Sequence, residues 1–150
     1  MPNHVRQQIR EAAVAAITGL ETTGGSVFES RALILNASFF PLWIVTTENE
    51  RNVDEEMTMG HKIRRDLDLV FEGYVKTGSG DSGCDLIDTM IKELEVSIYA
   101  NRKLGGLAKD TVLVSIELDN DDSGDEVFTA VKVLFSTTYW THRGAPDVSI

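Results

Sequence analysis

A glycine-rich segment of the chain matches a phosphate-binding pattern. Residues 78–83 read GSGDSG and fit G-x-G-x-x-G between a predicted strand and a predicted helix. The preceding strand alternates polar and apolar residues, whereas the strand of a dinucleotide fold is buried on both faces. Asp81 and Asp85 would repel a phosphate, and Cys84 and Asp85 stand where a P-loop needs Lys and Ser or Thr. We therefore interpret the segment as a flexible link.

A second segment, residues 119–124, has the alternating oxygens and sixth-position glycine that open a calcium loop. Its twelfth position would be Ala130 instead of a bidentate Glu, and strands instead of helices are predicted on both sides. His4, His61 and His142 lack the spacing of a metal site. The sequence therefore predicts neither a metal nor any other cofactor.

The remaining reactive side chains also favour non-catalytic roles. Cys84 is the single cysteine, which fits a reducing compartment, and no histidine lies near it in sequence to activate it. Asp66 and Asp68 share a predicted strand face with Arg64, which favours a salt-linked surface over a catalytic carboxylate pair. We expect a protein that is not an enzyme.

Length and charge narrow the class of protein further. A chain of 150 residues suits one domain. A formal net charge of −10 argues against a general nucleic-acid binder, which needs a basic face, but is compatible with a surface past which DNA slides. The sequence has no apolar run near 18 residues and no signal peptide at its polar start, so no membrane association is expected.

The first third of the chain predicts a helix followed by strands. A helix is expected from about Asn3 to Leu20 because apolar residues recur every three or four positions. Two short strand-like runs are expected within residues 27–47, on either side of a link that contains Asn36, Ala37 and Ser38. After Pro41, residues 42–45 are apolar on both faces and are placed inside a sheet.

The middle of the chain predicts a loop, a strand and a second helix. Asn49–Gly60 is polar and acidic and is interpreted as a long exposed loop. His61–Lys76 alternates with period two, which predicts a strand with one covered face and one mostly wet face. A helix is expected from the glycine-rich link to about Asn101. Its predicted buried stripe comprises Leu86, Ile87, Met90, Ile91, Leu94 and Ile98.

The last third predicts a hairpin and a tail. In residues 112–118, the side chains of Val112, Val114, Ile116 and Leu118 are expected on one face of a strand. Residues 119–125 form an acidic turn, and 127–140 a long final strand. From about residue 141 a short polar tail is expected. The predicted fold is α+β: a mixed, mostly antiparallel sheet of about five strands with two main helices packed on one face, in a single domain covering 1–150.

The stretch from Val27 to Thr47 resembles the tail terminator proteins of long-tailed phages, the lambda-like minor tail family. That family shows an apolar pair, an acidic residue, a small residue and Arg, and then a Phe-Pro or Leu-Pro that leads into a buried strand. The matching positions here are Val27, Phe28, Glu29, Ser30, Arg31, Phe40 and Pro41. The likeness continues in element order through the alternating strand, the second helix and the final strand.

The resemblance implies a structural virion protein, assembled in the host cytoplasm, that forms a hexameric ring on the end of the tail tube. Such a ring stops tube polymerisation and provides the head-joining surface. The implied partners are further copies of the chain, the tail tube protein and a head-completion or connector protein, while DNA passes the channel without specific binding. A head-completion or tail-to-connector ring protein is the alternative. A small α+β enzyme or ligand-binding domain is a third possibility.

Candidate interface residues lie at two places in the sequence. Arg31 follows the first strand run and is expected to meet a carboxylate of a neighbouring protomer. Within the predicted loop 49–60, apolar methionines on an acidic background invite a partner surface. The loop residues expected at the interface are Asp54, Glu55, Glu56, Met57 and Met59.

Overall fold

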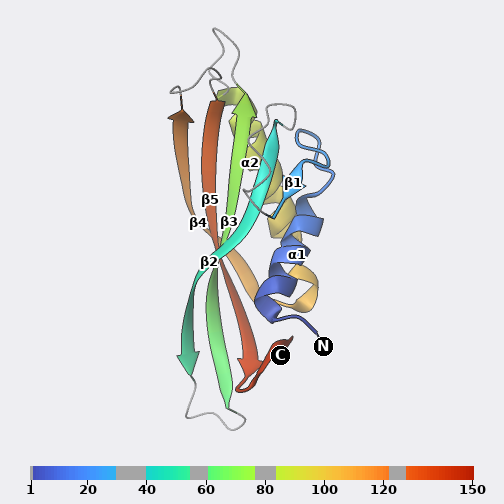
Figure 1. Ribbon diagram of the computed structural model, residues 1–150, viewed down its shortest axis with the longest axis vertical. Coiled ribbons are helices and arrows are strands. Elements are labelled where there is room, and N and C mark those ends of the chain that lie inside the picture. The colour runs from blue at the N-terminus through green and yellow to red at the C-terminus, as the bar shows by residue number, and fades with distance from the viewer. Residues whose placement is uncertain (1, 30–39, 55–60, 77–83, 122–127) are drawn as a thin grey trace.

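The protein is a six-stranded sheet with two helices on one face (Figure 1). The computed structural model describes residues 2–29, 40–54, 61–76, 84–121 and 128–150. The predicted α+β class is confirmed, with one strand more than expected. The elements are α1 (Val5–Ile17), β1 (Val27–Phe28), β2 (Leu42–Asp54), β3 (Lys62–Lys76), α2 (Cys84–Ala100), the 3-10 turn η3 (Leu104–Gly106), β4 (Asp110–Asp121), β5 (Phe128–His142) and β6 (Ala145–Ser149).

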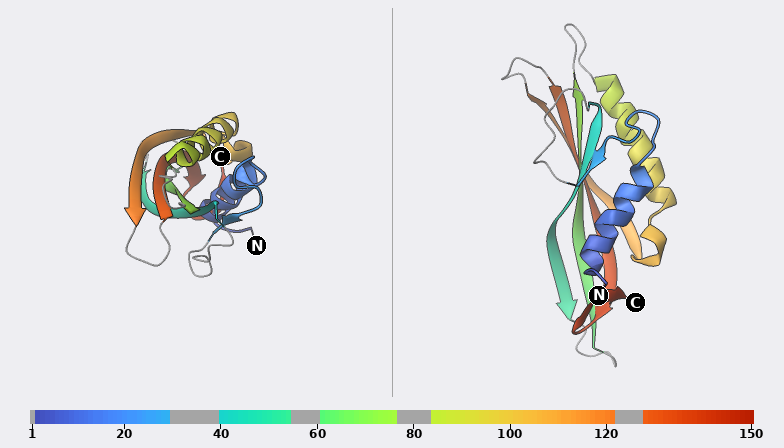
Figure 2. Two further views of the ribbon diagram at one scale, coloured as in Figure 1. Left: turned by 90° about the horizontal axis from the view of Figure 1, so that it is seen from above. Right: turned by 45° about the vertical axis from the view of Figure 1, so that its right-hand side comes forward.

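The strands are ordered β1-β2-β3-β5-β4, and β6 pairs with the end of β5. The β1–β2 pair is parallel, and all other pairs are antiparallel. The β3–β5 pair runs without interruption from Lys62 opposite His142 to Lys76 opposite Phe128. The sheet twists strongly along these long strands, so that it curls when seen down the long axis of the molecule (Figure 2).

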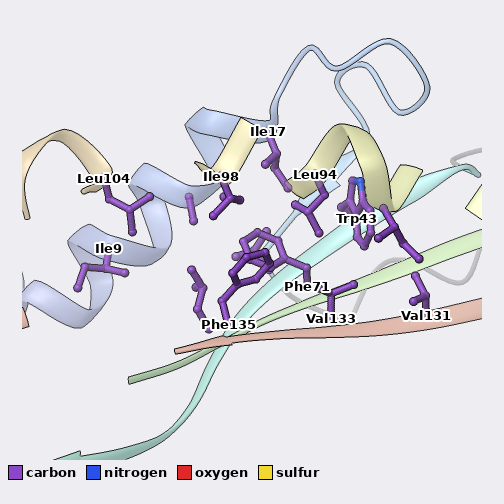
Figure 3. Packing of buried hydrophobic residues seen from close by; sticks show 14 of the residues in the cluster. Ile9, Ile17, Trp43, Phe71, Leu94, Ile98, Leu104, Val131, Val133 and Phe135 are labelled. Carbon is purple, nitrogen blue, oxygen red and sulfur yellow. The ribbon is translucent and has the colours of Figure 1, made fainter. Parts of the chain in front are cut away.

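The main core lies between the sheet and the two helices (Figure 3). The predicted helix stripes supply it: Ile9 and Ile17 from α1, and Leu94 and Ile98 from α2, are fully buried. On the sheet, Phe71 makes edge contacts with the rings of Trp43 and Phe135, at centroid distances of 6.5 and 5.5 Å. Leu86, predicted in the α2 stripe, is instead 39% exposed.

The predicted loop over Asn49–Gly60 is wrong in its first part. β2 continues through Asn49 to Asp54, paired with β3. Composition misled the prediction, because cross-strand partners satisfy the charges: Glu50 pairs with Arg65 and Arg51 with Asp68.

The mostly wet face predicted for β3 is also wrong. Asp68, Val70 and Glu72 point to the face without helices and are nevertheless buried. The curl of the sheet and a second cluster on this face account for the burial. That cluster contains Leu42, Ile44, Phe28, Phe40 and Tyr74.

Two further differences concern the end of the chain and β4. The predicted tail after residue 141 forms β6, which returns along β5. In β4 a bulge lies between Leu113 and Ser115, so the side-chain alternation expected from Val112 onward is interrupted.

Candidate functional site

Several of the large apolar side chains that are exposed among the described residues lie on β4 and on α2. We call the group formed by Val96, Tyr99, Leu113, Ile116 and Leu118 the β4–α2 surface. Tyr99 is 73% exposed, Val96 64% and Leu118 59%. Single exposed apolar residues are common on proteins, but Val96, Tyr99 and Leu113 line one groove, and such a group indicates a surface that a partner covers.

The bulge in β4 creates this surface. Leu113 pairs with Phe135, Ile116 with Val133 and Leu118 with Val131. Residues that pair across a sheet share a face, so the three β4 side chains lie on the helix side, beside the core. They stay exposed because the helices pack mainly over the inner strands of the sheet (Figure 2).

A groove of about 380 Å³ runs between α2 and β4. Ile98 and Phe135 contribute to its lining from the core side, and Val96, Tyr99 and Leu113 from the outside. Arg102 lies with its guanidinium carbon 5.6 Å from the centre of the Tyr99 ring. An apolar groove with charged residues at its margin has the composition of a protein-binding surface.

β4 is also an edge strand. No described strand pairs with its outer side, so its backbone N–H and C=O groups there are open to a partner. Proteins protect free edges with Lys, Pro or charged residues. Residues 111–116 contain no charged residue, and all of β4 lacks Lys and Pro. The bulge and the exposed Glu117 and Asp119 protect this edge in part, and the uncharged residues 111–116 remain suited to pairing.

The face without helices is strongly charged. Three cations lie close to carboxylate oxygens on this face. The distances are 3.3 Å from Arg51 Nη2 to Asp68 Oδ1, 3.4 Å from Arg64 Nη2 to Asp66 Oδ2, and 3.7 Å from Lys132 Nζ to Glu48 Oε2. Glu117 and Asp119 of β4 lie on the same face and are exposed. Because these cations have carboxylate partners within the protomer, this face offers phosphates little uncompensated positive charge.

A buried polar cluster lies under the start of α1. Arg65 contacts Glu50 at 3.1 Å and donates to the Thr141 hydroxyl at 3.0 Å, while the Tyr139 hydroxyl donates to Glu50. Burial, aided by the bond to Glu50, raises the pKa of Tyr139 above its usual range. The side chains of Arg65 and Glu50 are only 12% and 8% exposed. These groups satisfy one another, so the cluster ties β2, β3 and β5 together and leaves no acid or base poised for substrate.

The interface residues predicted from sequence fall almost entirely elsewhere. Arg31, Glu55, Glu56, Met57 and Met59 lie outside the described residues. Asp54 is the last residue of β2 and pairs with Ile63, and its side chain is not described. The sequence reasoning missed the β4–α2 surface, although Leu113 is an apolar residue on the otherwise polar face of the strand predicted over 112–118, which was a usable signal.

Among the described residues, no group of three or more His, Cys, Asp or Glu side chains is placed to hold a metal ion. Within the same ranges, no helix is long and apolar enough to cross a membrane.

Comparisons with known proteins find a distant structural likeness. No protein-family model matches the chain, and no curated protein matches it. Among solved structures, a chain of the "Virion of native gene transfer agent (GTA) particle" aligns over 90% of both chains, with 11% identity and a TM-score of 0.40. At that TM-score the likeness carries no argument about function.

Proposed function

We propose that this chain is a structural protein of a tailed phage or phage-like particle that closes a tail tube by forming a ring on its end. Bound there, it hides the surface on which the next tube ring would add and presents a surface for joining the head. The resemblance of residues 27–47 to tail terminators, continued in the order of the later elements, suggests this role and a hexameric ring.

The observation that supports assembly most strongly is the β4–α2 surface. Exposed apolar side chains and an open strand edge occur together on one side of the protomer. Both features favour association with another protein chain over solvent. A closed ring uses heterologous contacts, in which one surface of each protomer meets a different surface of its neighbour.

The electrostatics fit a channel through which DNA moves. The chain carries a net charge of −10, and Arg51, Arg64 and Lys132 of the helix-free face lie beside carboxylates. Duplex DNA binds proteins mainly through uncompensated Lys and Arg. We propose that DNA passes the ring without specific binding, and that the protein acts by surface recognition and not by catalysis.

The test is a phage from which the gene for this chain has been removed. Overlong tails that fail to join heads are the expected result, because nothing then terminates the tube. Tails of normal length that fail to join heads would contradict termination and favour the head-completion alternative. Normal tails joined to heads would overturn both. Mass spectrometry of purified wild-type virions should find the protein in the particle, and its absence would contradict a structural role.

A further inference from the structure

We infer that β4 of one protomer pairs antiparallel with the outer edge of β2 of the next protomer, so that the ring contains a continuous sheet. This inference rests on the proposed function and assigns its protomer contact. The occupant of the β4 edge is therefore a second copy of the chain, and the segment that it contributes is Asn49–Asp54.

The two strands supply the longest open edges of the described sheet. β1 pairs only with Trp43 and Ile44 of β2. Farther along, the Glu48 carbonyl accepts a hydrogen bond from Arg6, and residues 49–54 then have no described strand on their outer side. β4 is open along its whole length. Each protomer thus carries two different edges, as a heterologous contact requires.

The directions of the two strands are compatible with pairing. β2 is antiparallel to β3, β3 to β5, and β5 to β4, so β2 and β4 run in opposite directions. A neighbour related by rotation about the ring axis keeps this relation, and its β2 would meet β4 in the antiparallel arrangement. In the joined sheet, the helix-covered faces of the two protomers would lie on the same side.

The charges on the matching face are complementary. Arg51 points to the helix-free face and its side chain is 64% exposed, even beside Asp68. Glu117 and Asp119 project from the same face of β4 and are exposed. In a continuous sheet Arg51 would lie beside these carboxylates across the protomer boundary. A neighbouring strand would also cover the outer flank of Leu113, Ile116 and Leu118.

The two edges lie toward opposite ends of the molecule. Closing the sheet into a ring requires such a displacement between neighbouring strands. The free part of β2 lies toward the lower end in Figure 1, and β4 ends near the top. Strands of a closed sheet must tilt against its axis, and neighbouring strands must be staggered along their length. We therefore place each protomer inclined to the ring axis, displaced along the strands relative to its neighbour.

A charge exchange tests the contact. We expect Arg51→Glu to reduce ring formation on tube ends, counted by electron microscopy, by about tenfold or more. The double variant Glu117→Arg, Asp119→Arg should do the same, and the triple variant that combines all three should restore the rings. Lys92→Glu, an exposed charge on α2 beside Leu20 and Glu21, is the matched control. Thermal unfolding of each variant separates assembly from folding.

Crosslinking tests the register and excludes a two-fold contact. In a Cys84→Ser background, Asn52→Cys together with Ile116→Cys should form disulfide ladders up to the full ring. Ile116→Cys alone should stay monomeric in a denaturing gel, and crosslinked dimers of this single variant would show β4 meeting β4 and overturn the inference.

If wild-type rings form and both charge variants form them equally well, this contact is wrong while the proposed function stands. If the wild type forms no ring on tubes, the proposed contact and the proposed function both fail.

Discussion

Gly73 is the residue whose size is most tightly limited. It lies on β3 between Trp43 of β2 and Val131 of β5. A Cβ at this position would lie 2.8 Å from Cζ3 of Trp43 and 2.9 Å from Cγ1 of Val131. Both neighbours are buried core residues, so neither has free space into which it could move. A close approach of this kind requires glycine.

We predict that Gly73→Ala destabilises the protein by about 1–3 kcal/mol, because overpacking forces core side chains out of their rotamers. Denaturant unfolding followed by tryptophan fluorescence is the measurement, and its signal comes from the displaced Trp43 together with Trp140. The matched control is Gly25→Ala, since no atom lies within 4 Å of a Cβ at Gly25. Equal stability of the two variants would show that the Trp43 packing is looser than described.

His4 couples the start of α1 to pH. Its Nδ1 accepts a hydrogen bond from the Arg6 backbone N–H at 3.0 Å and caps the helix. Burial, and then the nearby Arg65, lower the pKa of His4 below its ordinary 6.5, while the carboxylates of Glu50 and Asp147 oppose this effect. The folded state therefore prefers the neutral imidazole.

The sign of the pH effect follows from that preference. The stabilisation by neutral His4 is fully present above pH 6.5 and is lost as the pH falls toward the lowered pKa, because the unfolded chain takes up the proton first. We predict that the melting temperature of the wild type falls more than that of His4→Asn between about pH 7.5 and about pH 5. Asn keeps the cap acceptor and does not titrate. Parallel curves would contradict this role of His4.

At the scale of elements, the sequence predicted the parts whose pattern reports directly on burial. The buried stripes of α1 and α2 were predictable because one face of each helix meets the core. The prediction that Leu86 is buried was wrong, because Leu86 lies near the start of α2, where its side chain remains partly exposed. In β5, Val131, Val133, Phe135 and Tyr139 share the core face as expected. A long strand in the middle of a sheet has a regular alternation, and that regularity is visible in sequence.

The elements that were missed depend on partners distant in sequence. Residues 49–54 are too polar to be recognised as a strand, and they are strand because β3 pairs their backbone and neutralises their charges. The bulge at Val114 is a backbone feature, and it decides that Leu113 shares a face with Ile116. The candidate site at β4 and α2 depends on this bulge, which explains why the alternation alone did not reveal it.

β4 should tolerate a charge in the free protomer but not in the assembly. We predict that Leu118→Asp changes the unfolding free energy by about 1 kcal/mol or less, because the side chain is 59% exposed. Ring formation on tubes should be lost, since the charge would be buried in the contact without a partner. Val148→Asp is the control, because Val148 is 51% exposed but lies on β6. Normal rings with Leu118→Asp would exclude β4 from the interface.

At the scale of the whole molecule, the two faces of the curled sheet have different roles in this account. The helix side holds the main core and, at its edge, the apolar β4–α2 surface (Figure 2). The other side carries paired charges and a smaller apolar cluster. The net charge of −10 is consistent with the proposal that DNA passes the ring without specific binding. Two different open edges on one molecule, β4 and the free part of β2, suit a head-to-tail contact between protomers.

The most direct test of the central claim is the length of tail tubes polymerised in the presence of this protein. Tube protein from the same phage is allowed to polymerise with and without the purified chain, and tube lengths and ends are recorded by cryo-electron microscopy. Added protein should stop elongation, and a closed ring of the chain should cap one end of each tube. Tubes that grow to the same lengths with bare ends, in the presence of excess folded protein, would contradict it.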